Sequence, residues 1–365
     1  MTEASLPHVD DILRRTVEMD ASDLHLAPGL PPIARVYGDL VPLDDLPRLT
    51  PDDIRDLLFP VLKPYHREEL ESSWELDFSH SVPGVSRFRG NAMRQRSSLA
   101  VVFRLVPWEI PDLDELGLPD VLKDLARLPR GLVLITGPTG SGKTTTLAGM
   151  TGLINNERSV NIITIEDPIE FLHTHKKAII KQREVGSDTH SFVEALRHAL
   201  RHDPDVILIG EMRDRDSIGI ALTAAETGHL VLSTLHTQTA PLAVHRIIDS
   251  FPEAMRSQIR HQLAGSLQGV VAQQIIPRSD GDGRVVAAEV LMSTAAVRNM
   301  IREGKEHQIY SVMQTGRNSG MQTMDHALAD LCRRGLIDRS VAVSHCVDKA
   351  ELDRALNQGG GMMTL

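Results

Sequence analysis

The segment from Gly137 to Thr144 reads Gly-Pro-Thr-Gly-Ser-Gly-Lys-Thr and has the GxxxxGK[ST] spacing of a phosphate-binding loop. Its glycines allow backbone N–H groups to turn inward around phosphate oxygens. The lysine brings a positive charge to the β- and γ-phosphates, and the final threonine hydroxyl is a ligand for Mg²⁺. We therefore predict that ATP and Mg²⁺ bind at a loop made of Gly137, Pro138, Thr139, Gly140, Ser141, Gly142, Lys143, Thr144 and Thr145.

Acidic residues follow two short apolar runs of the same half of the chain. Residues 205–211 read Asp-Val-Ile-Leu-Ile-Gly-Glu and look like a Walker B strand that ends in Glu211 rather than aspartate. Residues 166–170 read Glu-Asp-Pro-Ile-Glu and end in Glu170. A carboxylate at the carboxyl end of a strand beside the loop can hold the Mg²⁺ shell or orient the attacking water. From the residues alone, either carboxylate can take either task.

Other candidate side chains are a histidine and a group of arginines. His236 follows the apolar run 230–235, where contact with a γ-phosphate is expected, although a lone histidine is more often structural. Five arginines, two of which share a strand face by period-two geometry, concentrate positive charge in an acidic chain. An arginine fork suits phosphate, and a solvated edge strand is the alternative. The five are Arg87, Arg89, Arg94, Arg96 and Arg104.

The elements that position the loop are expected to form a parallel sheet. Four short, nearly continuous apolar runs alternate with helical segments, which is typical of strands buried on both faces. These runs are 132–136, 160–165, 206–209 and 230–235. A helix is predicted over 191–202, with Ser191 and Glu194 spaced as a capping box. A turn at 280–283 predicts an antiparallel hairpin between 270–276 and 285–291.

The N-terminal part shows a different pattern. Helices are expected over 8–18 and 50–62, strands over 24–26 and 33–36, and strand-like alternation runs through 87–104. We predict an α/β chain in which a smaller α+β domain precedes the P-loop domain. The predicted boundaries are 1–105 for the first domain, 106–118 for a proline-rich hinge, 119–355 for the ATPase domain with C-terminal helices, and 356–365 for a flexible tail.

Composition limits the class of protein. The chain has 365 residues, of which 41% are hydrophobic, so it can bury a core in each of two domains. A net charge of −10 and 3% aromatic residues argue against nucleic-acid binding. No apolar run reaches the ~18 residues of a membrane helix, and no apolar segment opens the chain as a signal peptide. The two cysteines lack CxxC spacing, which is expected of reduced thiols in the cytoplasm.

Several segments together resemble the secretion and type IV pilus ATPase superfamily. They are 21–26 (Ala-Ser-Asp-Leu-His-Leu), 87–91 (Arg-Phe-Arg-Gly-Asn), 166–170, 200–214, 227–237 and 271–276 (Val-Ala-Gln-Gln-Ile-Ile). Within it, residues 296–303 are similar to the retraction-linked motif AIRNLIRE, with Val297 and Met300 as conservative departures. Residues 320–325 match a stretch typical of the PilT-type pilus retraction ATPases. Gly90 and Met93 depart from the family, which more often has bulkier residues there.

The resemblance implies a PAS-like N-terminal domain, a RecA-like ATPase domain and a homohexameric ring. It implies a cytoplasmic motor, peripheral to the inner membrane, that acts on a platform protein and drives pilus retraction in twitching motility. Glu211 would belong to Walker B, Glu170 to an acidic box that activates water, and His236 to a histidine sensor. The two glutamates could exchange roles. Arg89 and Arg104 would reach phosphate from another domain or subunit.

Three other functions remain as alternatives. An assembly or secretion ATPase of the same superfamily shares the chemistry and differs in the cellular task. A ring subunit that binds ATP only to regulate a partner motor would not need the intact acids. A nucleic-acid translocase would require salt-dependent DNA binding, which the acidic charge disfavours.

Overall fold

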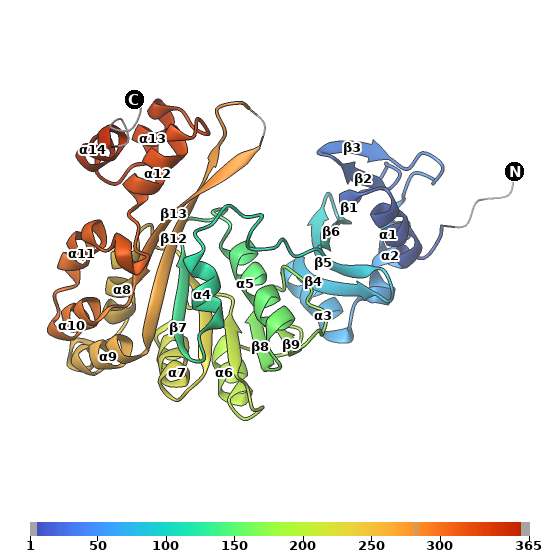
Figure 1. Cartoon of the computed structure of the whole chain (residues 1–365). Helices are drawn as coiled ribbons and strands as arrows, with labels where there is room; N and C mark the ends of the chain where they lie inside the picture. The colour runs from blue at the N-terminus through green and yellow to red at the C-terminus, as the bar shows by residue number, and fades with distance from the viewer. Residues whose placement is uncertain (1–5, 282, 359–365) are drawn as a thin grey trace, which may run out of the picture. The chain divides into compact units, whose positions relative to one another are not determined.

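The computed structural model describes residues 6–281 and 283–358, which form two compact units (Figure 1). The first unit contains the chain up to Glu109 together with Glu170–Leu172. The second contains Ile110–Ile169 and the chain from His173 onward. Each unit has its own sheet and its own core, so the predicted α/β fold class is confirmed.

The first unit is a six-stranded antiparallel sheet with the strand order β3-β2-β1-β6-β5-β4. Its apolar core contains side chains from the strands and from all three of its α-helices. The elements are α1 (Val9–Glu18), β1 (Ala21–Leu26), β2 (Ile33–Val36), β3 (Asp39–Pro42), α2 (Pro51–Leu58), α3 (Pro64–Ser73), β4 (Glu75–Val82), β5 (Ser86–Gln95) and β6 (Ser98–Val106).

Two features of the first unit refine the sequence predictions. The helix predicted over 50–62 ends at Leu58 and continues as a short 3₁₀ turn, Phe59–Val61, because Pro60 lacks the N–H that an α-helix needs. The alternating stretch 87–104 is divided into two strands by a hairpin turn. Arg96 and Ser97 adopt positive φ values of 46° and 65° in that turn, although glycine or asparagine usually occupies such positions.

Gly90 of β5 lies directly opposite Phe78 of β4. A Cβ at position 90 would come within 2.2 Å of the Phe78 ring, so the ring occupies the volume that a side chain would need. Phe78 also packs edge-to-face on Phe103, with ring centroids 5.6 Å apart. The small residue at this departure from the family pattern therefore makes room for an aromatic cluster.

The second unit is built on a seven-stranded sheet with the order β13-β12-β7-β11-β10-β8-β9. All neighbouring strands are parallel except the β12–β13 pair, which is antiparallel as predicted. The strands are β7 (Gly131–Thr136), β8 (Asn161–Glu166), β9 (Ile179–Glu184), β10 (Val206–Ile209), β11 (Leu230–Leu235), β12 (Leu267–Pro277) and β13 (Arg284–Met292). Strand β9 was not predicted, because polar residues interrupt its apolar pattern.

Helices cover both faces of this sheet, which explains why its strands are continuously apolar. Alternate residues of β7 show this: Leu132 and Leu134 face one core, whereas Val133 and Ile135 face the other. Helices α4 (Val121–Arg127) and α5 (Lys143–Glu157) cover the second face. The first face is covered by α6 (Phe192–Ala199), α7 (Arg215–Glu226), α8 (Ala240–Asp249), α9 (Glu253–Ser266), α10 (Ala295–Glu303) and α11 (Ile309–Thr315).

Three C-terminal helices form a separate small core with β12 and β13. They are α12 (Met324–Arg333), α13 (Arg339–His345) and α14 (Lys349–Gln358). Helix α14 continues to Gln358 and so includes the first three residues of the tail predicted over 356–365. Residues 359–365 of that predicted tail lie outside the described residues.

Candidate active site

The loop between β7 and α5 has the backbone that phosphate binding requires. Gly137 has a φ of 142°, and a Cβ there would lie 2.4 Å from the Gln273 carbonyl oxygen. Gly142 has a φ of 85° and occupies the N-cap of α5. Because glycine has no side chain, no N-cap side chain accepts a hydrogen bond from the N–H groups of the first turn. These N–H groups and the positive end of the helix therefore face the loop, which is the usual arrangement for binding an anion.

Lys143 lies within the loop and is 8% exposed. Its ammonium group donates to the carbonyl oxygens of Gly137 and Pro138, both at 2.9 Å. Burial lowers the pKa of Lys143, and the negative charge of Glu211 partly opposes this change. The lysine charge is thus held at the centre of the loop, within electrostatic reach of a carboxylate from another strand.

The remaining loop residues differ in exposure. Pro138, Thr139, Gly140 and Thr144 are exposed, and Thr145 is half-buried. The Ser141 hydroxyl is buried and has no hydrogen-bond partner among the described residues, so its bonding capacity remains available at the loop. An exposed threonine hydroxyl in the first turn of α5 can reach a metal bound to nucleotide phosphates.

A supporting contact behind the loop was not predicted. Gln273 of β12 is 1% exposed and exchanges hydrogen bonds with Thr146 of α5, with nitrogen–oxygen and oxygen–oxygen distances of 2.9 and 3.2 Å. Its carbonyl also lies against Gly137. A polar pair, Gln273–Gln274, within an apolar strand was the available sequence signal for this contact.

Glu211 and His236 lie next to each other beyond the carboxyl ends of the parallel neighbours β10 and β11. The His236 Nε2 atom is 3.2 Å from one carboxylate oxygen of Glu211, and Arg213 donates to the other at 2.8 Å. Arg213 was not predicted as a site residue. The Glu211 side chain is 21% exposed and that of His236 is 47% exposed, so the carboxylate is shielded and the ring is accessible.

The acidic segment 166–170 at the end of β8 has residues in both units: residues 166–169 belong to the second unit, and Glu170 belongs to the first. Glu166 is 8% exposed and accepts from the Thr164 hydroxyl at 2.6 Å and from Gln182 at 3.2 Å. Asp167 lies 3.6 Å from Arg213. Glu170 belongs to the first unit, where it forms an ion pair with Arg89 at 2.7 Å. Glu166 and Asp167 therefore have partners within the second unit, whereas Glu170 has its partner within the first unit.

Arg89 and Arg104 are direct partners across the β5–β6 pair of the first unit. Each arginine has a carboxylate partner, since Arg104 donates to Asp23 of β1 at 2.8 Å and Arg89 donates to Glu170. Although burial disfavours the charged form of Asp23, hydrogen bonds from Ser22 and Arg104 hold its pKa below the ordinary value. The carboxylates offset the repulsion between two like charges on neighbouring strands.

Oxygen ligands suit Mg²⁺, and the second unit provides the Thr144 hydroxyl and the Glu211 carboxylate for such a metal. Within residues 6–281 and 283–358, no group of three or more His, Cys, Asp or Glu side chains is arranged to hold a metal ion. In the described part of the chain, no helix has the length and apolar character needed to cross a membrane.

Comparisons with known proteins agree with this geometry. Residues 85–337 match the profile of the family described as type II/IV secretion system protein. The type IV pilus retraction ATPase PilT of Pseudomonas aeruginosa is 48% identical over 334 residues, which cover 92% of this chain and 96% of that protein. A twitching motility protein of Neisseria gonorrhoeae is 49% identical over 84% of this chain and 82% of its own length.

A solved structure shows the same fold. The crystal structure of the pilus retraction motor PilT with bound ADP has a TM-score of 0.87 and 48% sequence identity. The match covers 96% of this chain and all of that chain. The matched structure holds a nucleotide, as the loop in this chain predicts.

Proposed function

This chain belongs to the type II/IV secretion system protein family and is an ATPase, and we propose that it powers the retraction of type IV pili. The observation that carries the proposal is the meeting of Lys143, Glu211 and His236 at the carboxyl ends of the parallel strands of one sheet. These groups provide a phosphate-binding cation, a carboxylate and an accessible imidazole. Similarity over nearly the whole chain to a retraction ATPase supports the cellular task.

The residues of the second unit bind and orient the nucleotide. The N–H groups at the start of α5 and the Lys143 ammonium bind the β- and γ-phosphates. Thr144 and Glu211 would hold Mg²⁺, and a metal bound there would neutralise charge that develops on the phosphates. His236 senses the γ-phosphate and passes its presence to Glu211 through their 3.2 Å contact. Thr145 and the exposed loop residues complete the wall around the phosphates.

Glu170 activates the attacking water, and Arg89 and Arg104 are additional phosphate ligands that act in cis or from a neighbouring subunit. Because both arginines are held by carboxylates in the first unit, recruitment to phosphate requires exchange of these ion pairs. Closure at the proline-rich hinge 106–118 would couple that exchange to movement. Force then comes from the different nucleotide affinities of open and closed arrangements.

We further propose a homohexameric ring on the cytoplasmic side of the inner membrane, where it acts on a pilus platform protein. This assembly fits catalysis that depends on residues outside the phosphate-binding unit. A micrograph of the purified protein with and without nucleotide tests it, and a monomer under both conditions would contradict it.

A phosphate-release assay and a deletion strain test the function. Wild-type protein should hydrolyse ATP, and Lys143→Ala should abolish hydrolysis because the phosphate-binding charge is lost. A deletion strain should retain excess surface pili and lose twitching, whereas loss of an assembly ATPase would leave no pili. Absence of phosphate release from the wild type would favour a subunit that binds ATP only to regulate another motor.

A further inference from the structure

Glu289, at the centre of β13, is completely buried and was not assigned a role by its sequence pattern. One of its carboxylate oxygens accepts from the Ala240 N–H at 2.7 Å. The other faces the Met324 N–H at 3.4 Å. A charged residue in this position is unusual, because β13 is otherwise apolar at its buried positions and burial of a carboxylate is costly.

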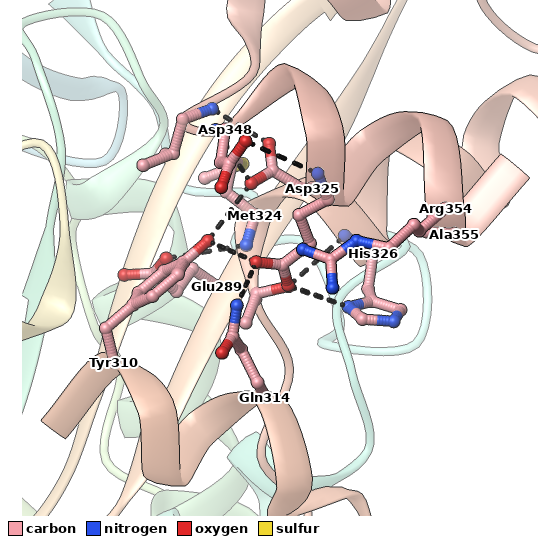
Figure 2. A network of polar contacts seen from close by, with 12 residues as sticks. Glu289, Tyr310, Gln314, Met324, Asp325, His326, Asp348, Arg354 and Ala355 are labelled. Atoms are coloured by element: carbon pink, nitrogen blue, oxygen red, sulfur yellow. Dashed lines mark hydrogen bonds and ion pairs between the residues drawn. The ribbon is translucent and has the colours of Figure 1, made fainter. Parts of the chain in front are cut away.

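The two N–H groups that face Glu289 belong to the first residues of two helices. Ala240 begins α8 after the N-cap Thr239, and Met324 begins α12 after the N-cap Thr323. Both helices therefore direct their positive ends at one carboxylate. Figure 2 shows Glu289 and Met324 close together, with the remainder of the polar network around them.

The contact between Glu289 and the first residue of α8 lies at one end of a short loop, and the other end of this loop lies at the proposed nucleotide site. Residues 236–239 join β11 to α8 and begin with His236. At its first end the loop is held by Thr136, whose hydroxyl donates to the Thr237 carbonyl at 2.6 Å and accepts from the Thr237 N–H at 3.0 Å. Thr136 immediately precedes the phosphate loop. Glu289 holds the other end of this loop at Ala240.

The start of α12, which Glu289 contacts, is bonded to the neighbouring helices by a second set of polar side chains (Figure 2). The Thr323 hydroxyl donates to Glu351 of α14 at 2.8 Å, and Tyr310 of α11 lies 2.9 Å from Glu351 and 3.0 Å from Asp325. Asp325 in turn accepts from the backbone N–H groups of residues 347 and 348 at 2.8 and 3.0 Å. The N-terminus of α12 is therefore bonded to α11, to α14 and to the residues 347–348 that immediately precede α14.

We propose that Glu289 is a positioning residue for ATP hydrolysis, which holds the loop 236–239 in a fixed position relative to α11 and the C-terminal helices α12–α14. The inference rests on the proposed ATPase site. Within the part of the chain that the structure describes, the Glu289 side chain bonds to the N–H groups of Ala240 and Met324 and to no proposed ligand of nucleotide or metal, so it acts through the position of His236. A displacement of the C-terminal helices that moved the start of α12 would be transmitted to the sensor loop through the Glu289 carboxylate, which contacts the first residues of both α8 and α12.

The test compares Glu289→Gln with the control Glu351→Gln in full-length protein. Both variants neutralise a buried carboxylate of the same network, but Glu351 accepts its hydrogen bonds from Tyr310, Gln314 and Thr323 rather than from α8. We expect Glu289→Gln to lower kcat for phosphate release about 10-fold, because small misplacements of site residues have effects of this size or larger. KM and the affinity for a fluorescent ADP analogue should stay within about 2-fold, since the phosphate loop is unchanged. Glu351→Gln should retain most of the wild-type kcat, because the Glu289–Ala240 contact that holds the loop 236–239 is unchanged and glutamine can still accept from the Thr323 hydroxyl.

Hydrogen exchange gives a second readout that does not depend on activity. Glu289→Gln should increase deuterium uptake in peptides covering 236–242 and leave uptake in 137–146 unchanged. Unchanged uptake in 236–242, or an unchanged kcat, would overturn the inference. So would an equal loss of kcat in both variants that follows their loss of thermal stability. A wild type that releases no phosphate would instead overturn the proposed function, and this inference with it.

Discussion

The most specific prediction concerns the stability of the second unit as a function of pH. Burial, together with the nearby carboxylates Asp325 and Glu351, raises the pKa of Glu289 from 4.5 to about 7, although the N–H groups of Ala240 and Met324 oppose the change. Tyr310 from α11 faces the same network, and the pKa of Asp325 is also raised by its burial. Glu289 is therefore protonated more readily in the folded chain than in the unfolded chain.

The sign and size of the effect follow from proton linkage. Between pH 4.5 and about 7 the folded chain binds the Glu289 proton and the unfolded chain has lost it, so the free energy of unfolding falls as pH rises. One pKa unit corresponds to about 1.4 kcal/mol. With these values, Glu289 removes about 2 kcal/mol of stability between roughly pH 5.5 and 7.5, and only about 0.2 kcal/mol more above that range.

Glu289→Gln isolates this contribution, because glutamine does not titrate and every other group is shared with the wild type. Denaturant unfolding followed by far-UV circular dichroism reports the second unit, which contains most of the helices. The stability of the variant relative to the wild type should increase by about 2 kcal/mol from roughly pH 5.5 to 7.5. Trp74 and Trp108 both lie in the first unit, so their fluorescence transition should not differ between the two proteins.

A constant difference between variant and wild type across this pH range would refute the reasoning. It would mean that the Glu289 carboxyl has the same pKa in the folded and unfolded chains. A difference that decreases with pH would show that the two helix N-termini outweigh burial and stabilise the charged form.

Three further predictions follow from other contacts. Glu211→Gln and Glu170→Gln should each lower kcat at least ~10²-fold in a phosphate-release assay, the usual scale for a base or positioning group, and normal turnover in either would assign its role to another acid. Gly90→Val should destabilise the first unit by about 1–3 kcal/mol because the added side chain overlaps the Phe78 ring, and the tryptophan transition should move to lower denaturant concentration. Arg302→Ala, at an exposed position of α10, should preserve ATP hydrolysis and impair twitching in cells, whereas a matching loss of both would show that the position serves the enzyme itself.

Much of the second unit was predictable because its local patterns are strong. Continuous apolar runs identified β7, β8, β10 and β11, and the turn at 280–283 identified the β12–β13 hairpin. Since parallel strands share one carboxyl edge, the meeting of Glu211 and His236 follows from strand ends alone. The edge strand β9 lacks such a run, because four of its six residues are polar and its side chains alternate between buried and exposed positions in its first half.

Long-range contacts were less predictable. No local pattern relates Gln273 to Thr146, or Glu289 to the starts of α8 and α12, because these partners are far apart in sequence. Motif resemblance also gives no information about which residues of α10 are exposed. Ile301 lies within the retraction-linked motif and is completely buried, so its substitution tests the core rather than a motor surface.

The pairing of Gly90 with Phe78 also affects how this protein can change over evolutionary time. A larger residue at position 90 overlaps the aromatic ring, and a smaller residue at position 78 leaves a void beside Phe103. Either substitution alone gives a less stable protein, and the two substitutions together can restore the packing. The pair should therefore be replaced jointly or not at all. Because Arg89 is the sequence neighbour of Gly90 in β5, the same restriction applies to the strand that carries the Arg89–Glu170 ion pair.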